Sequence, residues 1–204
     1  MRGTPTNPDS TNPRVSIIGL GNVLLGDDGF GCLAVEVFRC EYECGPEVEI
    51  IDLGTPGLDL APYLYGRDLV VIVDAVTAKG KPGTVCTYRE SDFLDSGAQL
   101  RVTDHDPGLH ESLAQLRLAG CGPSEVLVVG VIPECCVFGA GISSTVLAAS
   151  SNAVDSITRV LLERGLDCRK RCHPDQPKLW WIGDCTSNNS APARTVPAGH
   201  VTSS

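Results

Sequence analysis

Residues 17–31 read IIGLGNVLLGDDGFG, and this stretch decides the fold. The run from Val15 to Leu20 is apolar and rich in β-branched residues, which is typical of a strand buried on both faces. The glycines that follow allow a tight turn. From Phe30 onward, apolar residues recur with the spacing of an amphipathic helix, for which Asp27 or Asp28 is a natural N-cap.

A glycine-rich turn between a strand and a helix first suggests a nucleotide-binding site, but the details disagree. A dinucleotide fingerprint needs a glycine where this chain has Leu24. A P-loop needs Lys followed by Ser or Thr after Gly26, and the chain has Asp27 and Asp28 there. Because two carboxylates repel a phosphate, the turn predicts a site for a cation, or for a partner that carries one.

Length and charge restrict the class of protein. The chain has 204 residues, enough for one α/β domain with a sizeable core, and its net charge of −9 argues against nucleic-acid binding. No apolar run approaches the roughly 18 residues that span a bilayer, so we expect no membrane insertion. Residues 1–13 are polar and Pro-rich, which predicts a disordered arm without a signal core. We expect a cytoplasmic protein whose ten cysteines are reduced thiols.

Strand and helix patterns alternate along residues 14–166. Further strands are predicted at 48–52, 69–73, 84–88 and 126–132. Helices are predicted after Thr55-Pro56, after Asp106-Pro107, and from Ser143 to Gly165. This order predicts a three-layer α/β fold with a mainly parallel sheet covered by helices on both faces. Residues 167–204 do not continue the pattern and are predicted to form a partly disordered, Cys-containing extension.

Three polar side chains are predicted to meet where ligands bind such sheets, at the carboxyl ends of the strands. Asp28 follows the first strand, Asp74 ends the most apolar strand, and His105 directly precedes a helix start. Two carboxylates and an imidazole suit a divalent ion such as Ni²⁺ or Zn²⁺. If the carboxylates lie about 5 Å apart, their repulsion is roughly 3 kcal/mol at an effective dielectric constant near 20. A cation or a shared proton would relieve it.

Each of these residues has a simpler interpretation when taken alone. Asp28 is an ordinary helix cap, Asp74 a turn cap, and His105 a loop histidine bonded to the backbone. Only their common placement favours a site. His110 is predicted to be an exposed helical residue. A looser pattern in the extension is only weak evidence for zinc binding, since its spacing is irregular; it consists of Cys168, Cys172, His173 and Cys185.

Five motifs, in the correct order, resemble the hydrogenase maturation endopeptidases, which process the large subunit of [NiFe] hydrogenases. The first is Gly19-x-Gly21-Asn22-x-Leu24-x-x-Asp27-Asp28-Gly29-x-Gly31. The others lie at residues 52–58, 68–76, 105–120 and 129–134. Together the matches cover roughly residues 15–163, and they are specific as a set.

The resemblance implies a twisted five-stranded sheet between helices. It also implies an enzyme that removes a short C-terminal extension from the hydrogenase large-subunit precursor after nickel insertion. By motif position, Asp28, Asp74 and His105 bind the metal, which the precursor would supply. Many relatives carry glutamate at the position of Asp28, so the contribution of Asp27 stays open. The alternative function is a non-catalytic nickel-delivery or chaperone protein that uses the same acids.

Overall fold

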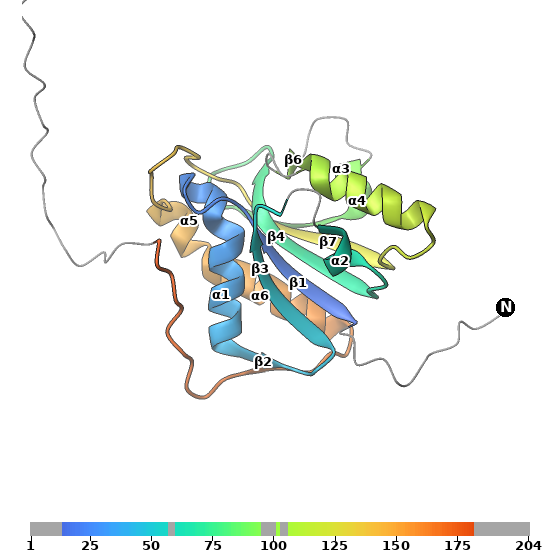
Figure 1. The fold of residues 1–204 in the computed structure, drawn as a ribbon. Helices are drawn as coiled ribbons and strands as arrows, with labels where there is room; N and C mark the ends of the chain where they lie inside the picture. The colour runs from blue at the N-terminus through green and yellow to red at the C-terminus, as the bar shows by residue number, and fades with distance from the viewer. Residues whose placement is uncertain (1–13, 57–59, 95–100, 103–105, 182–204) are drawn as a thin grey trace, which may run out of the picture.

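A mainly parallel β-sheet forms the middle layer of the molecule (Figure 1). The structure is a computed structural model, and it describes residues 14–56, 60–94, 101–102 and 106–181. The strands run in the order β3-β1-β4-β7-β5; β5 alone in this order is antiparallel to its neighbour and lies at the edge. A short sixth strand, β6, pairs antiparallel with the end of β4. The predicted five-stranded, mainly parallel sheet is confirmed.

The described elements follow the predicted alternation. The strands are β1 Val15–Leu20, β2 Tyr42–Cys44, β3 Val48–Gly54, β4 Leu69–Thr77, β5 Val85–Arg89, β6 Arg101–Val102, β7 Glu125–Val131 and β8 Cys168–Lys170. The helices are α1 Phe30–Glu41, α2 Ala61–Leu64, α3 Glu90–Leu94, α4 Asp106–Leu118, α5 Ser144–Ala148 and α6 Ser150–Glu163, with a 3₁₀ turn, η1, at Gly26–Gly29.

Two hydrophobic cores, one on each face of the sheet, make this a three-layer fold. On one face, α1, α5 and α6 bury side chains such as Phe38 and Ile157 against β1, β4 and β7. On the other face, α2 and α4 bury Leu64 and Leu113 against the same strands. Side chains alternate between the two cores along β4, so both faces of this central strand are apolar.

Gly31, the second residue of α1, packs against the backbone of the sheet, and its lack of a side chain makes this contact possible. A Cβ atom at this position would lie 2.1 Å from the carbonyl oxygens of both Leu20 and Val73. These oxygens belong to neighbouring strands: Leu20 ends β1, and Val73 lies in β4 beside the carboxyl end of β1. Any side chain here would push α1 and η1 away from that edge, where the candidate site is predicted.

Several local predictions were wrong. Neither Asp27 nor Asp28 caps α1: both lie in η1, and the N-cap of α1 is Gly29. The start of the second predicted helix is not tested, because residues 57–59 lie outside the described residues and α2 is described from Ala61. The last predicted helix is interrupted at Ala149, which separates α5 from α6.

The start of the predicted extension belongs to the ordered part of the chain. β8 pairs antiparallel with β2, which follows directly on α1. The predicted disordered arm and most of the tail lie outside the described residues. Within the described ranges, no helix combines the length and apolar character needed to cross a bilayer.

Candidate active site

Asp27 anchors the loop that follows β7. It is fully buried, and its carboxylate accepts hydrogen bonds from the backbone N–H groups of Glu134 (2.8 Å), Cys135 (2.9 Å) and Ser143 (2.6 Å). The Ser143 hydroxyl donates a fourth bond at 3.0 Å. A carboxylate has about four acceptor positions, so these bonds leave Asp27 little capacity to bind a metal. Its contribution is therefore to position the loop, a role that the sequence did not reveal.

Asp28 lies beside Asp27 but faces the end of β1. Its side chain is only 5% exposed in this chain, and its Oδ2 accepts a hydrogen bond of 2.8 Å from the backbone N–H of Asn22. Gly21 makes this approach possible, since a Cβ atom there would lie 1.8 Å from the Asp28 carbonyl oxygen. The turn of the first motif thus holds a buried carboxylate at the carboxyl end of β1.

Asp74 lies within β4, the strand next to β1. The prediction that it ends this strand was wrong, because β4 continues to Thr77 and pairs there with β6. Asp74 is fully buried, and its Oδ1 accepts a hydrogen bond of 2.7 Å from the N–H of Ala75. By the alternation of β4, it lies on the face that α2 and α4 cover.

His105, the third predicted site residue, lies outside the described residues. The helix that follows it, α4, begins at Asp106, so the predicted helix start is confirmed to within one residue. His110 is half-buried in α4, which corrects the prediction of an exposed residue. Among the residues described, no three His, Cys, Asp or Glu side chains form a cluster that could hold a metal ion.

Two thiols report on the electrostatics of this edge. Partial burial raises the pKa of the Cys136 thiol to about 11, and the nearby carboxylates of Asp28 and Asp27 contribute to this shift. Burial also raises the pKa of the Cys32 thiol, with contributions from Asp52 and Asp74. Burial is the larger cause of both shifts, and the neighbouring carboxylates add to it, so a negative group is disfavoured at this edge, whereas the carboxylates attract a cation.

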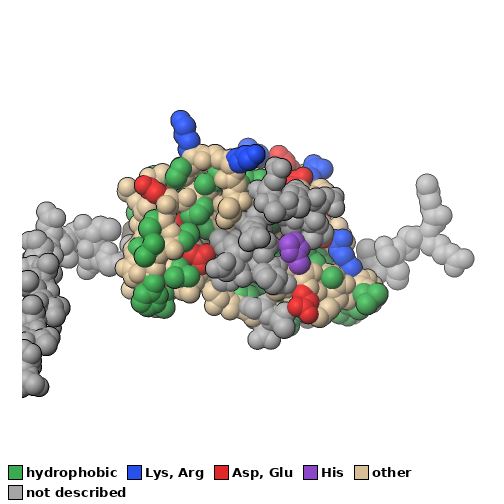
Figure 2. Space-filling model, turned by 90° about the horizontal axis from the view of Figure 1, so that it is seen from above, with side chains coloured by type: hydrophobic (Ala, Val, Ile, Leu, Met, Phe, Trp, Pro, Cys, Tyr) green, Lys and Arg blue, Asp and Glu red, His purple; other side chains and the backbone are tan. Residues whose placement is uncertain are grey.

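An exposed apolar patch adjoins the acidic residues. It consists of Leu24, Val137 and Phe138, whose exposed fractions are 49%, 58% and 76%. The backbone N–H of Gly139 donates to the Leu24 carbonyl at 2.9 Å, so the turn after β1 and the loop after β7 lie side by side. Figure 2 shows hydrophobic side chains gathered at one end of the upper face, where this loop lies in Figure 1.

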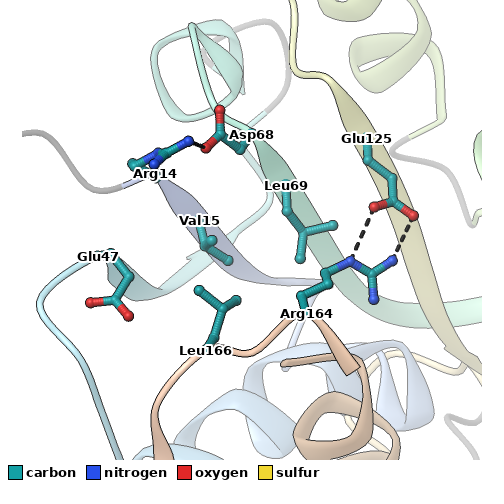
Figure 3. Close-up of a pocket in the computed structure, with 8 residues that line it drawn as sticks. All are labelled: Arg14, Val15, Glu47, Asp68, Leu69, Glu125, Arg164 and Leu166. Carbon is teal, nitrogen blue, oxygen red and sulfur yellow. Dashed lines mark hydrogen bonds and ion pairs between the residues drawn. The ribbon is translucent and has the colours of Figure 1, made fainter. Parts of the chain in front are cut away.

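A cavity of about 570 Å³ lies at the opposite edge of the sheet, where β1, β4 and β7 begin (Figure 3). Its charged side chains are largely paired with one another. Arg14 forms an ion pair with Asp68, and Arg164 binds both carboxylate oxygens of Glu125, at 2.6 and 3.1 Å. This cavity is therefore a poorer candidate for catalysis than the edge that carries Asp28 and Asp74.

Comparison with known proteins identifies the chain. A family model described as "Hydrogenase maturation protease" matches residues 32–160. The chain belongs to the hydrogenase maturation protease family. The Hydrogenase 2 maturation protease of Escherichia coli (strain K12) is 33% identical over 159 residues, which cover 78% of this chain and 96% of that relative. The HoxM protein of Azotobacter vinelandii, a hydrogenase expression/formation protein, is 32% identical over 157 residues, 76% of each chain.

Solved structures of hydrogenase maturation proteases share the fold. The endopeptidase HybD from Escherichia coli superposes with a TM-score of 0.72 at 33% identity and covers 78% of this chain and 98% of its own. The HybD protease from Thermococcus kodakarensis gives a TM-score of 0.59 at 27% identity, covering 72% and 98%. This chain is therefore an endopeptidase of the hydrogenase maturation type. These matches leave the roles of Asp28, Asp74 and His105 as predictions.

Proposed function

We propose that this chain removes the C-terminal extension of a [NiFe] hydrogenase large-subunit precursor once nickel has been inserted. In this proposal Asp28, Asp74 and His105 contact the nickel centre that the precursor carries. The metal is thus part of the substrate, and the protease supplies a preformed acidic edge. The reaction is expected in the cytoplasm, where cysteine thiols are kept reduced.

The observation that carries the proposal is the burial of two carboxylates beside the carboxyl end of β1: Asp28 lies in the turn that follows this strand, and Asp74 lies in β4, the adjacent parallel strand. Asp28 and Asp74 are 5% and 0% exposed, so both have lost most of their contact with water. Buried negative charge is costly, and a divalent cation that reaches such groups is stabilised more strongly than in water. A nickel centre held in a protein substrate supplies that charge only when the metal is present.

Two mechanisms are open for the cleavage step. The nickel either polarises the scissile carbonyl or activates a water molecule. Alternatively it serves only for recognition, and a carboxylate of the protease acts as general base. In both cases Asp28 and Asp74 fix the position of the metal relative to the scissile bond. In both cases, cleavage depends on the loading state of the precursor.

Incubation with nickel-loaded and nickel-free precursor tests the proposal. We expect the loaded precursor to lose its C-terminal peptide at least about 100-fold faster, because only the loaded form supplies the cation. Mass spectrometry of the precursor measures the cleavage. Equal rates for both forms would exclude nickel recognition. An unchanged precursor mass, with tight nickel binding by the protease chain, would instead favour the metal-delivery function.

We also propose that the precursor docks on the apolar patch of Leu24, Val137 and Phe138. The patch adjoins the acidic edge, and Asp27 ties its loop to the turn that contains Asp28. A polypeptide whose scissile bond lies near Asp28 would therefore cover these side chains. Burial of three large apolar groups contributes several kcal/mol to such an association.

Replacing Leu24 and Phe138 together by serine is expected to raise KM for the loaded precursor roughly tenfold, with less effect on kcat. The reason is that docking area is lost while the acidic residues stay in place. Steady-state cleavage assays separate the two constants. Leu118→Ser is the matched control, because Leu118 is 92% exposed and lies at the end of α4. An equal rise in KM for the control would remove the patch from substrate binding.

A further inference from the structure

Cys44 and Cys168 face each other in the small antiparallel sheet of β2 and β8. The strand register pairs them directly, and their Sγ atoms lie 3.8 Å apart. Both are free thiols. The neighbouring pair in this register, Tyr42 and Lys170, is also in contact: the Lys170 ammonium lies 5.8 Å from the centre of the Tyr42 ring. Side chains of the two strands thus meet pairwise along one face.

The backbone hydrogen bonds on either side of β2 and β8 show whether Cys44 and Cys168 form a hydrogen-bonded or a non-hydrogen-bonded pair of the ladder. The N–H of Arg171 donates to the Glu41 carbonyl (2.7 Å), and the N–H of Gly45 donates to the Asp167 carbonyl (3.1 Å). Hydrogen-bonded and non-hydrogen-bonded pairs alternate in an antiparallel ladder, so the cysteines occupy a non-hydrogen-bonded position. At such positions the Cα atoms lie about 4.5 Å apart, within the range that a disulfide requires. Small side-chain rotations are then enough to bring the sulfurs to bonding distance.

The surroundings hold the pair in place. Cys168 is buried and Cys44 half-buried, both against the core beneath α1 and α6, and Tyr42 stacks on Phe38 with ring centres 5.2 Å apart. Burial and the adjacent Cys168 thiol raise the pKa of Cys44 to about 12. Few Cys44 thiolates exist at neutral pH, so exchange with an external disulfide is slow there and faster in alkaline solution.

We propose that Cys44 and Cys168 form a reversible disulfide that fastens the C-terminal extension to the end of α1. The oxidant is a low-molecular-weight disulfide such as oxidised glutathione. One protein thiolate attacks it and releases one glutathione thiolate. The second protein thiolate then attacks the protein sulfur of the mixed disulfide and releases the other. The protein loses two electrons and two protons, and one glutathione disulfide becomes two glutathione thiols.

The bond joins residues 124 positions apart and ties β8, which follows α6, to β2, which follows α1. Closing so long a loop restricts the unfolded chain strongly. In Figure 1, β2 lies at the C-terminal end of α1. The acidic residues Asp27 and Asp28 lie at the opposite end, directly before the helix begins. Oxidation is therefore expected to stabilise the protease without changing its cleavage rate, and the inference does not depend on the proposed function.

The full chain, incubated with oxidised glutathione and then alkylated, tests the inference. Before alkylation we expect the intact mass to fall by two hydrogen atoms and Tm to rise by roughly 5–10 °C; after alkylation the oxidised chain should carry two alkyl groups fewer than the reduced chain. Digestion after Glu and Arg locates the bond, because these residues separate Cys44 from Cys40 and Cys168 from Cys172. A linked peptide that contains Cys44 and Cys168 is the expected product.

Two variants complete the test. Cys172→Ser is expected to keep the linked peptide, and Cys44→Ser to lose it along with the rise in Tm. Recovery of both cysteines as separate alkylated peptides from the wild type would overturn the inference, as would linkage of either to another cysteine. A linked pair with no change in Tm would overturn the fastening role.

Discussion

Replacing Asp74 with asparagine is expected to slow precursor cleavage by at least about 10³-fold while the chain stays folded. Asn is nearly isosteric with Asp, and its carbonyl oxygen can still accept the hydrogen bond from Ala75 N–H, 2.7 Å long in the native chain. Under the proposed function, the substitution removes a negative charge that faces the nickel centre of the precursor. Because the replacement leaves no cavity and keeps this hydrogen bond, we expect Tm to fall by only a few degrees at most. Single-turnover cleavage and thermal unfolding provide the two measurements.

Asp52→Asn is the matched control for Asp74→Asn. Asp52 is exposed near the carboxyl end of β3, and its Oδ1 accepts a hydrogen bond of 3.1 Å from the Gly54 N–H. The control removes the same charge from the same edge of the sheet, but from a solvated side chain. We expect less than about a threefold change in its cleavage rate. Equal losses in both variants would mean that only the overall charge of the edge matters, and full activity of Asp74→Asn would remove that residue from the mechanism.

The fold could be predicted from the sequence because its strongest signals are local. The run from Leu69 to Val73 is continuously apolar, as a central parallel strand requires, and the helical spacing after Phe30 is regular. Boundaries failed where tertiary contacts override local signals. The apolar run that stops at Val73 suggests a strand end at Asp74, but β4 continues to Thr77, where it pairs with β7 and β6.

The site was only partly predictable for a related reason. The placement of Asp28 after β1 and of Asp74 in the neighbouring strand β4 follows from the alternation of strands and helices, which is readable along the chain. The role of Asp27 depends on Glu134, Cys135 and Ser143, more than 100 residues away, and no spacing in the sequence indicates that contact.

Replacing Asp27 with alanine is expected to destabilise the protein by about 3 kcal/mol and to lower Tm by roughly 6–12 °C. The change removes a buried carboxylate that accepts four hydrogen bonds, three of them from the backbone of residues 134–143. The loop carries Val137 and Phe138, so docking of the precursor should weaken as well. Denaturant unfolding measures the free energy, and cleavage assays measure KM.

Alkylation of Cys136 gives a local readout of the same change. Its pKa is raised to about 11 by partial burial and by the carboxylates of Asp28 and Asp27. Loss of Asp27 removes one of these charges and frees the loop, so the pKa of Cys136 should fall and its alkylation near pH 8 should accelerate severalfold.

A parallel measurement on Asp28→Asn separates the two acids. We expect that variant to lose cleavage but to unfold within about 1 kcal/mol of the native chain, since asparagine is nearly isosteric with aspartate and its side-chain oxygen can still accept the hydrogen bond from the Asn22 N–H. If Asp27→Ala unfolds like the native protein and its Cys136 reacts no faster, the carboxylate does not hold the loop. Asp27 would then have to be reconsidered as a second acid that contacts the metal.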